Sequence, residues 1–168
     1  MKSKHRTLLV VFFIIVALFA VNWLNSGSNM RPDLTFTDID GQSHSLEQYN
    51  GKPILVTFWA TDCTGCIQEM PELIALHKQY SDQGLVMIDI AMSHDSPKHI
   101  KAMRDERKLP FIITWDKDNE MALAFDNVRV TPTHFLIEPN GEISMRKIGS
   151  LNHIILEDKL HKMGLSAI

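Results

Sequence analysis

The two cysteines of this chain, Cys63 and Cys66, follow directly on a run of apolar residues, Ile54–Trp59, that predicts a buried strand. The run is too short for an independent helix, is rich in β-branched and aromatic residues, and follows a glycine and a proline. Apolar residues then recur at helical spacing over residues 67–76, which predicts a helix. The cysteine pair therefore lies where a strand leads into the first turn of a helix.

This position predicts redox chemistry. Two intervening residues on a first helical turn put both sulfur atoms on one face, within reach of a disulfide. The helix dipole and the free N–H groups stabilise a thiolate at Cys63, and a thiolate is the attacking species in thiol–disulfide exchange. We predict that Cys63 is the nucleophile, that Cys66 is the resolving thiol, and that Trp59 packs beneath them.

Two other interpretations of the cysteine pair are open from the sequence. A zinc site would need a second metal-binding pair, but the chain has only 2 cysteines, and its histidines are scattered. A purely structural disulfide suits an exported domain, although a bridge that closes so short a loop constrains the unfolded chain very little.

The N-terminal segment differs in composition from the rest of the chain. A basic head contains Lys2, Lys4 and Arg6, and an apolar run follows over residues 8–24. At about 1.5 Å per residue this run approaches the roughly 30 Å core of a lipid bilayer. Since a small-x-small cleavage pattern is poorly formed, we predict an uncleaved signal anchor at residues 1–24, with a cleaved signal peptide as the alternative. The positive-inside rule then places the rest of the chain outside the cytoplasm.

Residues 25–32 are rich in Ser, Gly and Asn, which predicts a linker, and a single domain is expected over residues 33–168. Outside the basic head the chain has 14 basic against 20 acidic residues, a net charge of about −6. An acidic domain without a basic cluster argues against nucleic acid as a partner.

The pattern along the domain predicts an α/β fold. We expect an N-terminal hairpin over residues 34–46, strands at 85–91 and 111–115, helices at 97–108 and 119–125, a hairpin over 133–148, and a last helix at 152–163. Strands that alternate with helices, followed by a hairpin and a helix, imply a mixed sheet flanked by helices on both faces.

Several short motifs are informative as a set. They are Phe58-Trp59-Ala60-Thr61 before the cysteines, Glu69-Met70-Pro71 after them, Gly51-Lys52-Pro53, Val130-Thr131-Pro132-Thr133 and Asn140-Gly141-Glu142-Ile143. In order and spacing this set resembles the TlpA and ResA group of membrane-tethered, thioredoxin-like thiol-disulfide oxidoreductases. The resemblance covers most of the exported chain. It implies a thioredoxin-like fold and no diffusible cofactor.

The resemblance also assigns roles to individual residues. It implies a cis peptide bond before Pro132, and a Thr131 backbone that pairs with an extended substrate. We accordingly predict that Thr131, Pro132 and Trp59 form the substrate-binding set. Glu69 is implied to exchange a proton with Cys66, while a solvated helix carboxylate is an interpretation of equal weight.

Three residues next to the cysteines depart from the pattern of this group and are predicted to tune the redox pair. Asp62 replaces a common aromatic residue, and it either disfavours a thiolate at Cys63 by charge repulsion or caps the helix. Both effects favour a reductant. Thr64 and Gly65 lack the usual proline before the second cysteine, and Gly65 adds backbone freedom.

Two further departures lie in the strands. Thr57 occupies the position where thioredoxin has a buried acid, so we expect proton handling of that kind to be absent. His134 replaces a typical threonine, and we expect a histidine on the surface.

The function predicted from these features is the reduction of disulfides in exported proteins, with apocytochrome c as one candidate. The domain is expected in the periplasm, held at the bacterial inner membrane by a single span in the lipid bilayer over residues 8–24. Electrons would come from a membrane thiol transporter of the DsbD or CcdA kind, as the resemblance implies. The alternatives are a disulfide oxidase or isomerase, and a Sco-like copper-binding module that uses Cys63, Cys66 and His134. A peroxidase of the peroxiredoxin type is disfavoured, because its Pro-x-x-x-Thr-x-x-Cys pattern is missing.

Overall fold

The computed structural model describes residues 14–16 and 30–166, and the chain from residue 31 onward forms one compact unit. The predicted anchor at residues 1–24, apart from residues 14–16, and most of the predicted linker at residues 25–32 lie outside the described residues. No helix within the described part of the chain is long and apolar enough to cross a membrane.

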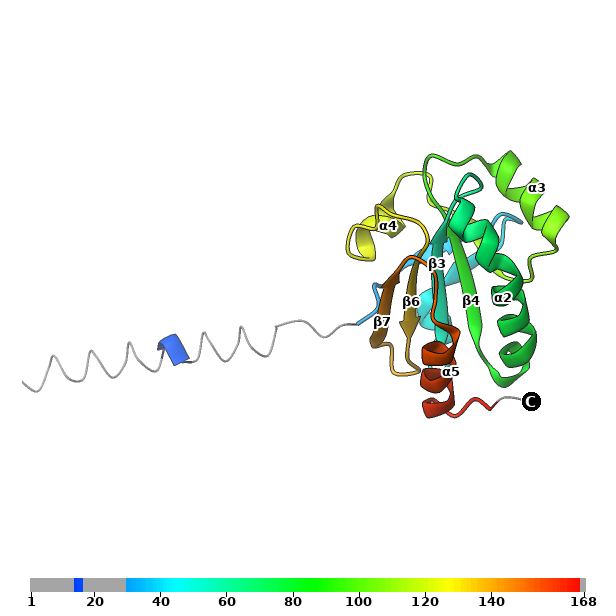
Figure 1. The fold of residues 1–168 in the computed structure, drawn as a ribbon. Helices are drawn as coiled ribbons and strands as arrows, with labels where there is room; N and C mark the ends of the chain where they lie inside the picture. The colour runs from blue at the N-terminus through cyan, green and yellow to red at the C-terminus, as the bar shows by residue number, and fades with distance from the viewer. Residues whose placement is uncertain (1–13, 17–29, 167–168) are drawn as a thin grey trace, which may run out of the picture. The chain divides into compact units, whose positions relative to one another are not determined.

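A five-stranded sheet forms the centre of the compact unit, in the order β5-β4-β3-β6-β7 (Figure 1). Its strands are β3 (Ile54–Trp59), β4 (Val86–Ala91), β5 (Ile112–Trp115), β6 (Thr133–Ile137) and β7 (Ile143–Ile148). Strands β3, β4 and β5 are parallel to one another, whereas β6 runs antiparallel to both β3 and β7. The sheet is therefore mixed, as the sequence predicted.

The predicted N-terminal hairpin is present as β1 (Thr35–Thr37) and β2 (Ser43–Ser45). Gly41 in its turn has a φ of 88°, a left-handed conformation that favours glycine. The hydroxyl of Thr114 in β5 donates a hydrogen bond to the carbonyl oxygen of Thr37, at 2.8 Å. The hairpin is thereby attached to the β5 edge of the main sheet.

Helices lie on both faces of the main sheet. The helices described from residue 31 onward are α2 (Thr64–Tyr80), α3 (Pro97–Arg107), α4 (Glu120–Ala124) and α5 (His153–Lys162), with short 3-10 turns η1 (Leu46–Tyr49) and η2 (Ser81–Gln83). Helices α2, α3 and α5 share one apolar core with the sheet, while α4 and the hairpin share the other (Figure 1).

Strand β3 lies between these two cores, and all 6 of its residues are buried. Leu55 and Trp59 belong to the core under α2, whereas Val56 and Phe58 belong to the core under α4. Because side chains alternate along a strand, Thr57 lies on the α2 face, between Leu55 and Trp59. A polar group is thus placed directly beneath the helix that carries the cysteines.

Candidate active site

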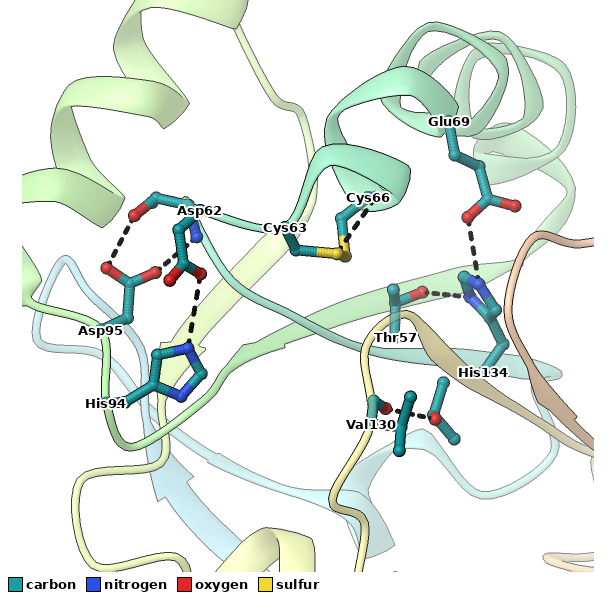
Figure 2. Close-up of a disulfide and its surroundings, with 11 residues drawn as sticks. Thr57, Asp62, Cys63, Cys66, Glu69, His94, Asp95, Val130 and His134 are labelled. Atoms are coloured by element: carbon teal, nitrogen blue, oxygen red, sulfur yellow. Dashed lines mark hydrogen bonds and ion pairs between the residues drawn. A yellow bond between two sulfur atoms is a disulfide. The ribbon is translucent and has the colours of Figure 1, made fainter.

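Cys63 and Cys66 form a disulfide across the start of α2, with the sulfur atoms 2.02 Å apart (Figure 2). Cys63 is the N-cap residue, and its Sγ atom accepts a hydrogen bond from the backbone N–H of Cys66 at 3.2 Å. An N-cap side chain usually accepts such a bond through oxygen. Here sulfur takes that place, so in the reduced protein the same N–H group and the helix dipole favour a thiolate on Cys63.

The two cysteines differ in accessibility. Cys66 is buried, with 3% of its surface exposed, whereas Cys63 is half-buried. Trp59 is 1% exposed and lies in the same core cluster, in agreement with the prediction that it packs beneath the pair. An incoming sulfur atom therefore meets Cys63 first, and Trp59 has no surface left for direct contact with a substrate.

The loop that precedes the cysteines is held by Asp95, a residue that sequence analysis did not select. The backbone N–H of Thr61 donates to Asp95 Oδ2 at 2.7 Å, and the Thr61 hydroxyl donates to Asp95 Oδ1 at 2.9 Å (Figure 2). Asp95 follows β4 and lies 34 positions away from Thr61 in the sequence. No local pattern signals this contact, because it forms only when the ends of β3 and β4 meet.

Asp62 does not cap the helix, so that part of the prediction is wrong. Its side chain is 77% exposed and points toward His94, whose Nε2 atom lies 3.4 Å from Asp62 Oδ1 (Figure 2). Cys63 is itself the N-cap residue, and no position is left for a second capping side chain. The charge of Asp62 is screened by solvent, so it disfavours a thiolate on Cys63 less than a buried charge would.

The residues between the cysteines face different surroundings. Thr64 is exposed, whereas the position of a Cβ atom on Gly65 would lie 3.6 Å from Cδ of Pro132. Gly65 does not have the positive φ seen at the turn glycines, so its significance is proximity to Pro132. The prediction that Gly65 adds backbone freedom stays a prediction, and the structure adds the contact of this position with Pro132.

The peptide bond between Thr131 and Pro132 is cis, as the family resemblance predicted. The carbonyl oxygen of Pro132 accepts a hydrogen bond from Gly149 N at 2.8 Å, which ties this loop to the end of β7. Pro132 is buried and Thr131 is half-buried, while Val130 beside them is 55% exposed. Val130, which sequence analysis did not select as a site residue, gives the surface of this loop an exposed apolar side chain.

Glu69 is buried, so the interpretation as a solvated helix carboxylate is wrong. Its surface is 5% exposed, and its Oε1 atom accepts a hydrogen bond from Leu151 N at 2.6 Å. Burial alone would raise the pKa of Glu69, but the contacts with His134 and the Leu151 N–H outweigh it and lower the pKa below its ordinary value. Glu69 is therefore an ionised carboxylate held inside the protein, one helical step from Cys66.

His134 is completely buried, so the prediction of a surface histidine is also wrong. Its Nδ1 atom lies 3.1 Å from the Thr57 hydroxyl, and its Nε2 atom lies 3.1 Å from Glu69 Oε2 (Figure 2). The second contact has ion-pair distance without the angle of a well-aligned hydrogen bond. Both ring nitrogens of His134 are thus directed at other protein groups.

Asp89 is a second buried carboxyl group that sequence analysis missed. It is 2% exposed in the middle of β4, and it pairs in register with Thr57, which in turn pairs with His134 on the other side. Burial raises the pKa of Asp89 well above its ordinary value, and the charge of Glu69 raises it further. Position 57 itself carries no acid, but the neighbouring strand places a buried carboxyl group beside it.

The arrangement of donors bears on the metal-binding interpretations. Within the described residues, no group of three or more His, Cys, Asp or Glu side chains is placed to hold a metal ion. His134 faces Thr57 and Glu69, so the copper module loses the histidine it would need.

Comparison with known proteins agrees with this geometry. Residues 28–146 match the model of the AhpC/TSA family. The thiol-disulfide oxidoreductase ResA of Geobacillus kaustophilus is 29% identical, over 97% of this chain and 99% of its own. The thioredoxin-like protein YneN of Bacillus subtilis is 33% identical, over 77% of this chain and 75% of its own. A structure described as a thioredoxin from Neisseria meningitidis superposes with a TM-score of 0.75 and 26% identity, over 82% of this chain and 91% of its own.

These matches fit the mixed sheet, the cysteine pair at the start of α2 and the cis proline beside it. The fold is thioredoxin-like, and the relatives named for an activity are named as thiol-disulfide oxidoreductases. The chain belongs to the AhpC/TSA family, and within it to the thioredoxin-like thiol-disulfide oxidoreductases of the ResA and TlpA kind.

Proposed function

We propose that the protein is a reductase of disulfides in exported proteins. The observation that carries this proposal is the pairing of a half-buried Cys63 at the N-cap of α2 with a buried Cys66. Only one of the two sulfur atoms is open to a large substrate, which separates an attacking thiol from a resolving one. A purely structural disulfide would need no such division.

The direction of the reaction is supported by the buried charge that α2 carries one helical step beyond Cys66. A strongly oxidising site is one that stabilises the thiolate of its reduced form. The ionised carboxylate of Glu69 lies one helical step from Cys66 and disfavours a second negative charge there. This effect favours electron donation by the dithiol, and it is stronger than that of the exposed Asp62.

In the proposed reaction, the Cys63 thiolate attacks a substrate disulfide and forms a mixed disulfide. One substrate sulfur leaves as a thiolate and takes a proton from water. Cys66 then gives its proton to Glu69 and attacks the Sγ atom of Cys63, which releases the second substrate thiolate. The substrate gains two electrons, and the enzyme is left with the disulfide shown in Figure 2.

The surface beside Cys63 suits a polypeptide substrate. Thr131 is half-buried and Val130 is exposed, and both precede the buried Pro132 that lies close to Gly65. We propose that an extended substrate segment lies along Val130 and Thr131 and pairs with the backbone there. Backbone pairing gives affinity with little choice of sequence, which suits a reductase with several clients.

The proposed location is the outer face of the bacterial inner membrane. The basic head and the apolar run at residues 8–24 support a single retained span, with residues 33–168 outside the cytoplasm. In that compartment electrons must cross the membrane, so the proposed donor is a thiol transporter of the DsbD or CcdA kind. Apocytochrome c is the proposed client to test first.

The experiment is a trap in cells with Cys66→Ala, which leaves the mixed disulfide on Cys63 without a resolving thiol. Client proteins should be recovered as adducts that a reductant releases, and Cys63→Ala should recover none of them. The purified wild-type protein should also reduce insulin. A missing adduct together with a negative insulin assay would refute thiol exchange, and a redox potential near those of strong oxidants would favour the oxidase instead.

A further inference from the structure

Four buried polar side chains meet where the cysteine helix α2 packs on the sheet, in a core that is otherwise apolar. Asp89, Thr57 and His134 stand in one row across β4, β3 and β6, and Glu69 reaches the row from α2. None of the four is more than 5% exposed. Burying polar groups is unfavourable unless they are paired, so a buried polar cluster of this size suggests a functional role.

The contacts of His134 are directional. An ionised carboxylate only accepts hydrogen bonds, so the Nε2 atom that faces Glu69 must carry a hydrogen. In the neutral ring, Nδ1 then accepts from the Thr57 hydroxyl, 3.1 Å away. The Glu69 carboxylate therefore selects the tautomer that carries hydrogen on Nε2, and the Thr57 hydroxyl, which can donate or accept, fits this tautomer.

The two carboxyl groups of the cluster have different surroundings. Glu69 has the histidine and the Leu151 N–H as partners, and its pKa is lowered. The Oδ1 atom of Asp89 has no hydrogen-bond partner among the residues that the structure describes, and the pKa of Asp89 is raised. When neighbouring environments push two acids apart in this way, the ionised one is suited to accept a proton and the other to hold one.

We propose that His134 is a positioning residue that keeps Glu69 ionised and directed as the proton acceptor for Cys66. The proposal rests on the proposed function, because it concerns the step in which Cys66 resolves the mixed disulfide. It assigns a role in that step to a histidine that is completely buried beside Glu69.

Other charged groups surround this contact from each packed element. Glu72 of α2 and His153 at the start of α5 form their own pair at 2.6 Å, and Lys147 of β7 stands opposite His134 in the strand register. His153 lowers the pKa of Glu69 only as the last of several causes. These groups stay unchanged in the variants below.

The test compares His134→Thr with His134→Gln, which keeps an N–H group near Glu69 but cannot carry a positive charge. In wild type, the decay rate of the mixed disulfide with insulin, followed by acid quench and mass spectrometry, should fall only at low pH. In His134→Thr, the fall of this rate at low pH (the acidic limb of its pH profile) should move to a pH that is higher by about 1 unit or more. A shift of this size is expected when a carboxylate loses a nearby cation or donor. His134→Gln should move the limb less.

His77→Gln is the control, because it removes a part-buried histidine that lies on α2 about two turns beyond Glu69, and it should leave this pH dependence in place. A uniform loss of rate in His134→Thr, with the limb unmoved, would overturn the proposal and indicate a packing role only.

A second readout does not depend on activity. The carboxyl ¹³C titration of Glu69 in the oxidised protein should shift to higher pH in His134→Thr, and no shift would refute the inference. If wild type reduces no insulin but this shift appears, the proposed function fails and the positioning role stands. Should His134→Thr fail to fold, the near-isosteric His134→Gln decides by the same titration.

Discussion

Replacing Asp89 with Asn should stabilise the protein by an amount that grows with pH. Asp89 is 2% exposed, and burial followed by the charge of Glu69 raises its pKa well above the ordinary 3.8. The folded protein therefore holds a proton that the unfolded chain releases above about pH 4. Between that pH and the pKa of Asp89 in the folded protein, the free energy of unfolding of wild type falls as pH rises, because the folded protein must keep Asp89 protonated.

The size of the effect follows from the linkage of one proton. The free energy of unfolding of wild type should fall by about 1.4 kcal/mol per pH unit from this group, up to the pKa of Asp89 in the folded state. Asn is neutral in both states and nearly isosteric, so Asp89→Asn lacks this slope. Between pH 5 and pH 7 the variant should gain up to about 2.7 kcal/mol over wild type.

The assay is urea unfolding of both oxidised proteins at pH 5, 6 and 7, with the disulfide intact. Only the change of the difference with pH is diagnostic, since an unpaired amide can shift the variant by a constant amount. The exposed Asp118 provides a control, and Asp118→Asn should run parallel to wild type. A difference between Asp89→Asn and wild type that stays constant from pH 5 to pH 7 would refute the reasoning.

Three further outcomes are expected. Asp95→Ala should lower the free energy of unfolding by about 2 kcal/mol in urea titration, because Thr61 loses two hydrogen bonds to a charged group, and an unchanged value would contradict the anchoring role. The Glu69 carboxylate, whose pKa is lowered, should contribute stability fully above pH 4.5 and lose it as pH falls through the folded pKa, so Glu69→Gln should flatten this acid limb in thermal melts between pH 2 and pH 6. Gly65→Ala should keep insulin reduction and gain up to about 1 kcal/mol of stability, because alanine favours helices and its Cβ would meet Pro132 at ordinary contact distance, whereas Gly65→Leu should slow the reduction.

The sequence predicts most of the fold because its signals are local. The apolar run at Ile54–Trp59 and the helical spacing after Cys63 each depend on a few neighbouring residues, and both elements are present. The cis bond before Pro132 is different, since only the family resemblance predicts it. Local signals thus place the cysteines at the N-terminus of α2, and the resemblance supplies the loop beside them.

The acid–base cluster was harder to predict, for a physical reason. His134 occupies the second position of β6, a strand buried on both faces, so a polar side chain there goes inside whichever face it takes. Asp89 interrupts the apolar β4 in the same way. These interruptions are signals, but their partners are decided by the pairing register of three strands and the approach of α2. Register is a tertiary property, and a single sequence gives no direct measure of it.

The contact between Gly65 and Pro132 has a consequence for how the active-site dipeptide varies. Thr64 points into solvent, so a random library at this position should return many functional clones. A Cβ atom at position 65 would already be in ordinary contact with Cδ of Pro132, so a library there should return fewer. Exchange of the whole dipeptide, to change the redox potential, would combine the effects of the two positions. A library limited to small residues at position 65 would separate changes in redox potential from steric contact with the Pro132 loop.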